Sequence, residues 1–172
     1  MCATAEIEIN NQSTDADTKE YLAFVLGEES YILDILNVQE IRGYDDVTKI
    51  ANVPDFIKGV VNLRGTIVPI IDLRLMLRLS AITYNDLTVV IILNMNGRVF
   101  GIVVDGVSDV VNFDPGLIRP IPEIVTSIDT KYITGLATIG EKMFILVDID
   151  RLINSWGGGF FDPVAHKEFS AA

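Results

Sequence analysis

An internal repeat is the feature that most restricts how this chain can fold. At an offset of 69 residues, a strand pattern followed by a turn and the motif V-x-acid-aliphatic occurs twice. The matching residues are Tyr31, Leu33, Ile35, Val38, Glu40 and Ile41 in the first half and Phe100, Ile102, Val104, Val107, Asp109 and Val110 in the second. At an offset of 76 residues, the apolar run Ile67–Asp72 matches Met143–Asp148, and both runs end in aspartate. Aliphatic strands resemble one another in any β protein, but two matches in the same order favour a duplication. The sequence therefore predicts two related subdomains.

The fold class follows from the short apolar runs, rich in Val, Ile, Tyr and Phe, that occupy the middle of the chain. They cover residues 21–26, 31–35, 59–63, 66–73, 88–94, 99–104 and 142–149. Runs that are apolar at nearly every position predict strands buried on both faces. Closed barrels bury such strands and remove exposed sheet edges. We therefore predict a mainly β fold of two small barrel-like subdomains that share an interface, with helical turns at residues 54–58, 75–79 and 151–155.

The two ends of the chain differ from its middle. Residues 1–19 are polar and acidic, and residues 156–172 begin with a run of glycines. Neither segment shows a sustained hydrophobic period, which is typical of chain ends that fray. The predicted organisation is a flexible tail over residues 1–19, one domain of two repeated subdomains over residues 20–155, and a second tail over residues 156–172.

Charge and cysteine content narrow the classes of partner and compartment. The chain has 172 residues, with 24 acidic against 13 basic residues and a formal net charge of -11. Such a charge repels nucleic acid and anionic lipid surfaces. Cys2, the one cysteine, cannot form an internal disulfide, and no apolar run approaches the ~20 residues of a membrane-spanning helix. We expect a cytoplasmic protein that neither inserts into a membrane nor binds nucleic acid.

Catalytic motifs are scarce in this sequence. His166, the one histidine, lies in the predicted tail, so Ser-His-Asp and Cys-His catalysis lack their central residue. No glycine-rich phosphate loop occurs, and no cofactor is expected. Asp72, Asp148 and Asp150 are candidate ligands for a hard cation, which leaves a carboxylate-based metal-dependent hydrolase as an alternative if they converge. The simpler interpretation is that Asp150 caps a short helix.

A hairpin turn is predicted at Asn62–Gly65. Asparagine favours the start of a turn, and glycine supplies the position with positive φ. Arg64 is thereby held at a rigid tip, where its guanidinium could bind an acidic or amide group of a partner at low ordering cost. The alternative is that Arg64 is a solvated turn residue with no function.

Residues 36–43 form a second unusual pattern. Val38 and Ile41 are three residues apart, a spacing that would place both on one side of a helical turn beside Glu40. Gly43 would end that turn. Periodicity alone leaves open whether this apolar stripe is core or contact surface.

Four segments of the chain resemble CheW, the family of bacterial chemotaxis coupling proteins. They are Ile35–Arg42 (ILNVQEIR), Ile57–Gly65 (IKGVVNLRG), Val68–Arg74 (VPIIDLR) and Gly101–Val107 (GIVVDGV). The resemblance implies two intertwined five-stranded SH3-like barrels on a shared hydrophobic core. It also implies an adaptor without catalytic activity that links the histidine kinase CheA to the cytoplasmic tips of methyl-accepting chemotaxis receptors.

The resemblance further implies two sets of contact residues and no cofactor or metal. Positions that match the receptor-binding groove of the family are Val38, Glu40, Ile41, Gly59, Leu63, Arg64, Val89 and Val107. Positions that match its kinase-facing surface are Gly43, Tyr44, Asp45 and Gly135. The isolated protein is expected to be a monomer that is recruited to membrane receptor arrays. A homologue serving another array, for pilus motility or a second-messenger pathway, is the alternative within the family; Trp156 and His166 match no signature of it.

Overall fold

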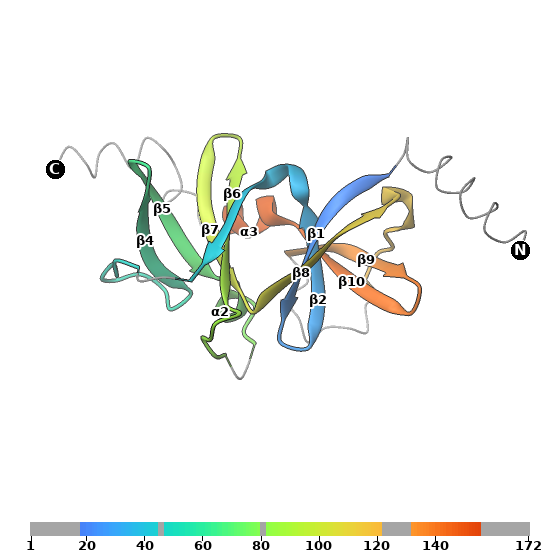
Figure 1. Cartoon of the computed structure of the whole chain (residues 1–172), viewed down its shortest axis with the longest axis horizontal. Coiled ribbons are helices and arrows are strands. Elements are labelled where there is room, and N and C mark those ends of the chain that lie inside the picture. Colours follow the sequence, from blue (N-terminus) through green and yellow to red (C-terminus); the bar gives the residue numbers. More distant parts are fainter. Residues whose placement is uncertain (1–17, 45–46, 80–81, 122–131, 156–172) are drawn as a thin grey trace, which may run out of the picture.

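The computed structural model describes residues 18–44, 47–79, 82–121 and 132–155. These residues form ten strands and four short helical segments (Figure 1). In chain order they are β1 Lys19–Leu26, β2 Glu29–Asp34, the 3-10 helix η1 Ile35–Asn37, β3 Val38–Gly43, β4 Ile57–Leu63, β5 Thr66–Asp72, α2 Leu73–Met76, β6 Val89–Met95, β7 Arg98–Val104, β8 Gly106–Phe113, the 3-10 helix η2 Pro115–Leu117, β9 Ile133–Ile139, β10 Lys142–Val147 and α3 Ile149–Ser155. The predicted mainly β class with few short helices is confirmed.

The strands form two five-stranded sheets that repeat one topology. Barrel 1 has the order β8-β1-β2-β10-β9, and barrel 2 has the order β3-β6-β7-β5-β4. The sequence repeat makes β1 to β5 equivalent to β6 to β10, so equivalent strands occupy equivalent places in the two barrels. Barrel 1 nevertheless takes β1 and β2 from the first half and the rest from the second, while barrel 2 does the reverse. The two halves of the sequence are therefore intertwined. The chain passes from barrel 1 to barrel 2 at β3 and returns to barrel 1 at β8 (Figure 1).

The register irregularities of the sheets repeat as well. In barrel 2, Val38 lies opposite Leu93 while Glu40 lies opposite Ile92, so Gln39 is an extra residue in β3. In barrel 1, β8 carries the same irregularity against β1, between Val107 and Asp109. The two bulges are 69 residues apart, as the repeat requires, so the duplication extends to local backbone geometry.

Alternating side chains of the central strands are buried in different cores. On β1, Leu22, Phe24 and Leu26 belong to a shared core that also contains Phe100 and Ile102 of barrel 2. The intervening residues Tyr21 and Ala23 belong to a separate core inside barrel 1. Barrel 2 has its own interior cluster, formed by Leu63, Val68, Ile70, Val90, Ile92 and Val103. Burial on both faces explains why these strands are apolar at nearly every position.

Two of the helical predictions are wrong. Residues 38–43 form strand β3, and residues 54–56 form a turn after which β4 begins at Ile57. In β3, pairing with β6 supplies the backbone hydrogen bonds that a local helical turn would otherwise make. The other two helical turns exist with shifted bounds, as α2 and α3. The cap of α3 is Asp148 rather than Asp150, because the Asp148 carboxylate accepts the N–H of Arg151.

Candidate partner-binding site

The bulge in β3 determines which side chains reach the surface beside the shared core. Directly opposed residues of an antiparallel pair point to the same face. Val38 opposes Leu93 and Ile41 opposes Ile91, and both of these partners belong to the shared core. Val38 and Ile41 therefore share one face of β3, although a regular strand would place them on opposite faces. Val38 is half-buried and Ile41 is 43% exposed, which leaves an apolar strip open at this edge.

Glu40 points to the other face of β3 and pairs with Arg64. It opposes Ile92, which belongs to the interior of barrel 2. Nη2 of Arg64 donates to Oε2 of Glu40 over 3.0 Å, and the Arg64 side chain is 76% exposed. Since β3 and β4 are the two outer strands of this sheet, the ion pair bridges the open seam of barrel 2.

The turn that carries Arg64 has an unusual residue at its first central position. Asn62 accepts the N–H of Gly65 over 2.8 Å, as a turn-starting asparagine should. Both Arg64 (φ 53) and Gly65 (φ 87) have positive φ, which is the two-residue hairpin geometry that favours Asn-Gly. The equivalent of Arg64 in the second half is Gly140 (φ 64). An arginine in this conformation costs backbone energy, which a purely structural turn would not require.

The remaining positions of the predicted receptor groove are more buried. Val89 and Val107 are half-buried and pack against the shared core. Leu63 lies in the interior core of barrel 2. Gly59 is buried beneath the backbone of Thr48. Among the eight predicted positions, Ile41 and Arg64 offer the most exposed side chains, and Glu40 lies beside Arg64.

The predicted kinase-facing positions fall at two places. Gly43 ends β3, and the ring of Tyr44 stacks on that of Tyr84 with centroids 4.9 Å apart. Gly135 is buried in barrel 1, where a Cβ would lie 2.6 Å from the carbonyl oxygen of Arg119. Asp45 lies outside the described residues.

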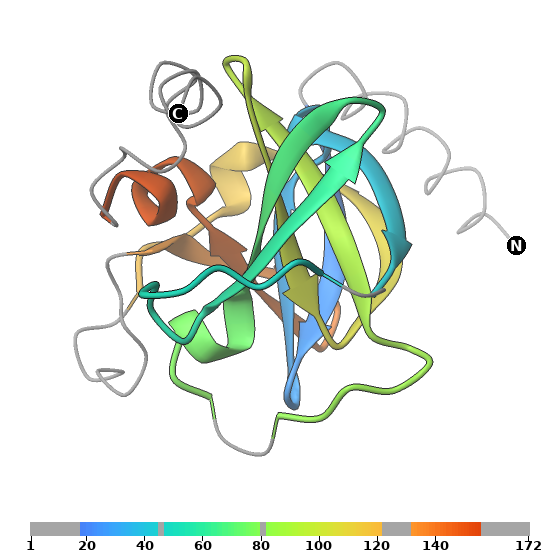
Figure 2. The same ribbon diagram turned by 90° about the vertical axis from the view of Figure 1, so that its left-hand side faces the viewer.

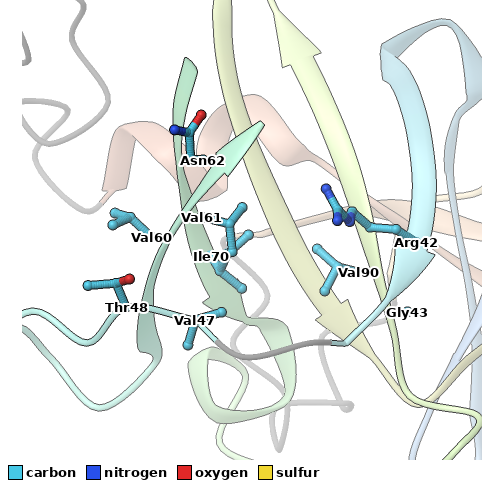
Figure 3. Close-up of a pocket in the computed structure, with 9 residues that line it drawn as sticks. All are labelled: Arg42, Gly43, Val47, Thr48, Val60, Val61, Asn62, Ile70 and Val90. Atoms are coloured by element: carbon cyan, nitrogen blue, oxygen red, sulfur yellow. The ribbon is translucent and has the colours of Figure 1, made fainter. Parts of the chain in front are cut away.

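A pocket of about 220 Å³ opens in the seam of barrel 2 beside Gly43 (Figure 3). Its lining residues are Arg42, Gly43, Val47, Thr48, Val60, Val61, Asn62, Ile70 and Val90. The repeat explains the space, because the barrel 1 equivalent of Val90 is Tyr21. Tyr21 stacks on Phe113 at 4.5 Å and fills the corresponding part of barrel 1. In barrel 2 the equivalent of Phe113 is Tyr44, which stacks on Tyr84 instead.

A buried ionic cluster at α2 was not predicted from the sequence. Arg74 is 1% exposed, and its Nε and Nη2 donate to the two carboxylate oxygens of Asp72 over 3.0 and 2.9 Å. Its Nη1 donates to Oδ1 of Asp105 over 2.6 Å, and Tyr84 donates its hydroxyl to Asp72. The sequence signal for this cluster was Arg74 itself, which follows by two residues the aspartate that ends the buried strand β5. Its significance depends on burial, which the local sequence does not reveal.

The cluster shifts the pKa values of Arg74 and Tyr84. Burial by itself lowers the pKa of Arg74, but the hydrogen bonds and charges of Asp72 and Asp105 outweigh this effect and raise that pKa above its usual value. Burial, together with the hydrogen bond to Asp72, raises the pKa of the Tyr84 hydroxyl. Arg74 therefore stays cationic and Tyr84 stays neutral across the physiological pH range.

Comparison with known proteins identifies the family. Residues 20–156 match the sequence model of the family described as "CheW-like domain". The chain belongs to the CheW-like family.

Similar proteins extend this match over most of the chain. The Chemotaxis protein CheW of Klebsiella aerogenes is 57% identical over 147 residues, which cover 86% of this chain and 89% of that protein. The Chemotaxis protein CheW of Rhizobium meliloti is 32% identical over 137 residues, which cover 80% and 88% respectively. A crystal structure of the scaffolding protein TtCheW from Thermoanaerobacter tengcongensis superposes with a TM-score of 0.70 at 38% identity, covering 75% of this chain and 88% of that chain.

Within this CheW-like fold, two of the three aspartates considered as metal ligands, Asp72 and Asp148, pair with arginines. Both carboxylate oxygens of Asp72 are bound by Arg74, and Asp148 pairs with Arg151 at 3.4 Å. Across the described ranges, His, Cys, Asp and Glu do not gather in groups of three that could hold a metal ion. The same part of the chain has no helix long and apolar enough to span a membrane.

Proposed function

We propose that this protein is a non-enzymatic adaptor of chemotaxis that links the histidine kinase CheA to the cytoplasmic tips of methyl-accepting receptors. The observation that carries the proposal is the 57% identity to a protein named chemotaxis protein CheW over most of both chains. The name of the similar solved structure, a scaffolding protein, supports the same role. The adaptor works in the cytoplasm and joins receptor arrays through its partners.

The receptor surface in this proposal is the apolar strip of Val38 and Ile41 together with the Glu40–Arg64 pair. A receptor helix can lay its apolar side against the strip, while Arg64 binds a carboxylate or amide at the edge of that helix. Because the hairpin holds the Arg64 backbone in place, binding orders only the side chain.

The kinase surface in this proposal lies around the seam pocket and Tyr44. Arg42, which lines the pocket, and Ile41, which lies on the shared-core side, point to opposite faces of β3. The apolar strip and the pocket therefore face different directions, while Glu40 lies on the pocket face of β3, 4.0 Å from Arg42, and the two surfaces meet there. This arrangement suits an adaptor that must hold two partners at the same time.

The variant Arg64→Asn is expected to keep the fold and lose receptor affinity. Asparagine tolerates positive φ better than arginine, and the exposed pair lost with Glu40 is worth about 0–1 kcal/mol, so the free energy of unfolding should stay within about 1 kcal/mol of the parent. Loss of one charge-assisted contact should weaken binding by about 1.5–3 kcal/mol, or roughly tenfold to a hundredfold. Calorimetric titration with a receptor cytoplasmic fragment and denaturant unfolding measure the two quantities.

Two further variants make this test specific. Arg78 is another exposed arginine with positive φ (59), so Arg78→Asn is a matched control that should bind normally. The double variant Glu40→Arg/Arg64→Glu restores an ion pair across the seam with reversed charges, and it should still bind weakly. Full binding by Arg64→Asn, or by the charge-swapped variant, would contradict a direct contact between Arg64 and the receptor.

The bridging role predicts that receptor and kinase bind simultaneously. Titrating the CheW-like domain of the kinase into a preformed complex of this protein with a receptor fragment, with labels on both partners, should give a ternary complex. Each contact is expected to have a Kd on the order of micromolar, which corresponds to about -8 kcal/mol. Many linked contacts in the array would raise the overall affinity above that of each single contact. Stoichiometric displacement of the receptor fragment at saturating kinase would show that the two surfaces overlap, and bridging would then be excluded.

A further inference from the structure

Arg74 is the largest fully buried side chain of the described protein, and its guanidinium joins two elements that are far apart in sequence. It lies on α2, directly after β5 of barrel 2. Besides its two bonds to Asp72, its Nη1 donates to Oδ1 of Asp105 and to the carbonyl oxygen of Thr83, each over 2.6 Å. The guanidinium carbon also lies 4.7 Å from the centre of the Tyr84 ring. These contacts fix both its position and its orientation.

Asp105 lies where the chain passes from one barrel to the other. It is the single residue between β7 of barrel 2 and β8 of barrel 1. Its N–H donates to the carbonyl oxygen of Val25 over 3.0 Å, and its Oδ2 accepts the N–H of Gly27 over 2.6 Å, so barrel 1 holds it on one side. Arg74 holds it on the other. In Figure 2, α2 (green) lies at the lower left, beside the lower ends of the strands.

We infer that the Arg74–Asp105 ion pair is an inter-barrel clamp that fixes how barrel 1 sits against barrel 2. The pair is short, charge-assisted and shielded from solvent on the arginine side, so it resists displacement by water more than an exposed pair does. Asp105 precedes Val107 by two residues, and the clamp therefore also sets the position of Val107 at the edge of the shared core. Arg74 and Asp105 are thus positioning residues for the proposed receptor surface; this consequence, unlike the clamp, rests on the proposed function.

The other crossover lacks an equivalent in the described residues. There Asp34 ends β2, caps η1 through the N–H of Leu36, and pairs with the exposed Lys19 at 3.7 Å. The repeat places Asp150, an acid, where Arg74 stands in the first half. The duplicated fold therefore does not itself require a buried arginine at this place. A specific role at the Asp105 crossover explains why the first half of the sequence has a buried arginine and the second half does not.

The test measures the distance between the barrels in the full chain. Ile67 and Met143 are equivalent in the repeat, lie one on each barrel and are 54% and 55% exposed, so cysteines at these two positions in a Cys2→Ser background can carry spin labels. The parent should give one narrow distance distribution. Asp105→Asn leaves Arg74 paired with Asp72 but removes the charge of the clamp, and it should broaden or shift that distribution. In unlabelled protein it should weaken receptor-fragment binding about threefold to tenfold.

A second variant and a control complete the design. Asp72→Asn/Arg74→Met removes the clamp together with both buried charges and leaves only Asp105, which is 29% exposed, without its cation; it should broaden the distribution as Asp105→Asn does. Asp148→Asn removes the charge from the partly exposed Asp148–Arg151 pair of α3, while asparagine can still cap the helix, and it should leave both measurements unchanged. Unchanged distances in Asp105→Asn would overturn the clamp, and altered distances with unchanged affinity would overturn its positioning role. Failure of the parent itself to bind the receptor fragment would contradict the proposed function, while the distances would still decide the clamp.

Discussion

The variant Phe100→Ala is expected to lower the free energy of unfolding by about 3–5 kcal/mol, as large-to-small changes of buried aromatic residues do. Phe100 is fully buried on β7 in the shared core, where strands of both barrels meet. The cavity would therefore lie between the barrels and destabilise both. We expect calorimetry to show one unfolding transition in the parent and one, at lower temperature, in the variant.

Hydrogen exchange locates the effect within each barrel. The backbone amides of Ile32, in the barrel 1 core, and Val103, in the barrel 2 core, should lose the same free energy of protection in Phe100→Ala. Leu117→Ala is a suitable control, because Leu117 is an exposed apolar residue and its loss should change stability by less than about 0.5 kcal/mol. Two resolved calorimetric transitions, or loss of protection in barrel 2 alone, would contradict cooperative unfolding.

The variant Gly59→Ala is expected to have the second-largest effect, with a loss of about 3 kcal/mol or more of unfolding free energy. Its φ of 144° is a region that costs other residues about 1–3 kcal/mol. A Cβ would also lie 2.2 Å from the carbonyl oxygen of Thr48, a backbone atom held by hydrogen bonds to Val60. Relief of this clash requires the segment at Thr48 to move away from β4. Thermal and denaturant unfolding measure the loss.

Gly97→Ala is the matched control for Gly59→Ala. Gly97 also has positive φ (87), but a Cβ there would meet nothing within 4 Å. Its substitution should cost about 1 kcal/mol, the backbone contribution alone. If the two variants lost equal free energy of unfolding, the close contact between Gly59 and the Thr48 backbone would not account for the loss in Gly59→Ala. The comparison also bears on receptor binding, because a Gly59 variant that binds weakly must first be shown to be folded.

Much of the candidate site could be predicted from local sequence. Asn62 and Gly65 indicated the hairpin that holds Arg64 at its tip, and the structure confirms that turn. The pairing of Arg64 with Glu40 could not be predicted, because Glu40 lies on β3, across the seam of barrel 2. Val38 and Ile41 do share one face, as predicted, but a bulge in a strand produces this arrangement instead of a helical turn. A spacing of three residues fits both, and only pairing with β6 decides between them.

By itself, the sequence determined the duplication, the β class and the turn chemistry of this protein. These depend on local properties: the apolar pattern of each strand, the φ preference of each turn residue, and the similarity of the two halves. The family resemblance implied intertwined barrels, but no local pattern determines the exchange of strands, since either half could complete a barrel with its own strands or with those of the other half. Tertiary structure decided it. It also decided the Arg74–Asp105 pair, which joins residues brought together by that exchange. The reason is that a strand edge can hydrogen-bond with any strand beside it, and a buried charge can pair with any opposite charge beside it. Which strand or charge lies there depends on the free energy of the whole fold.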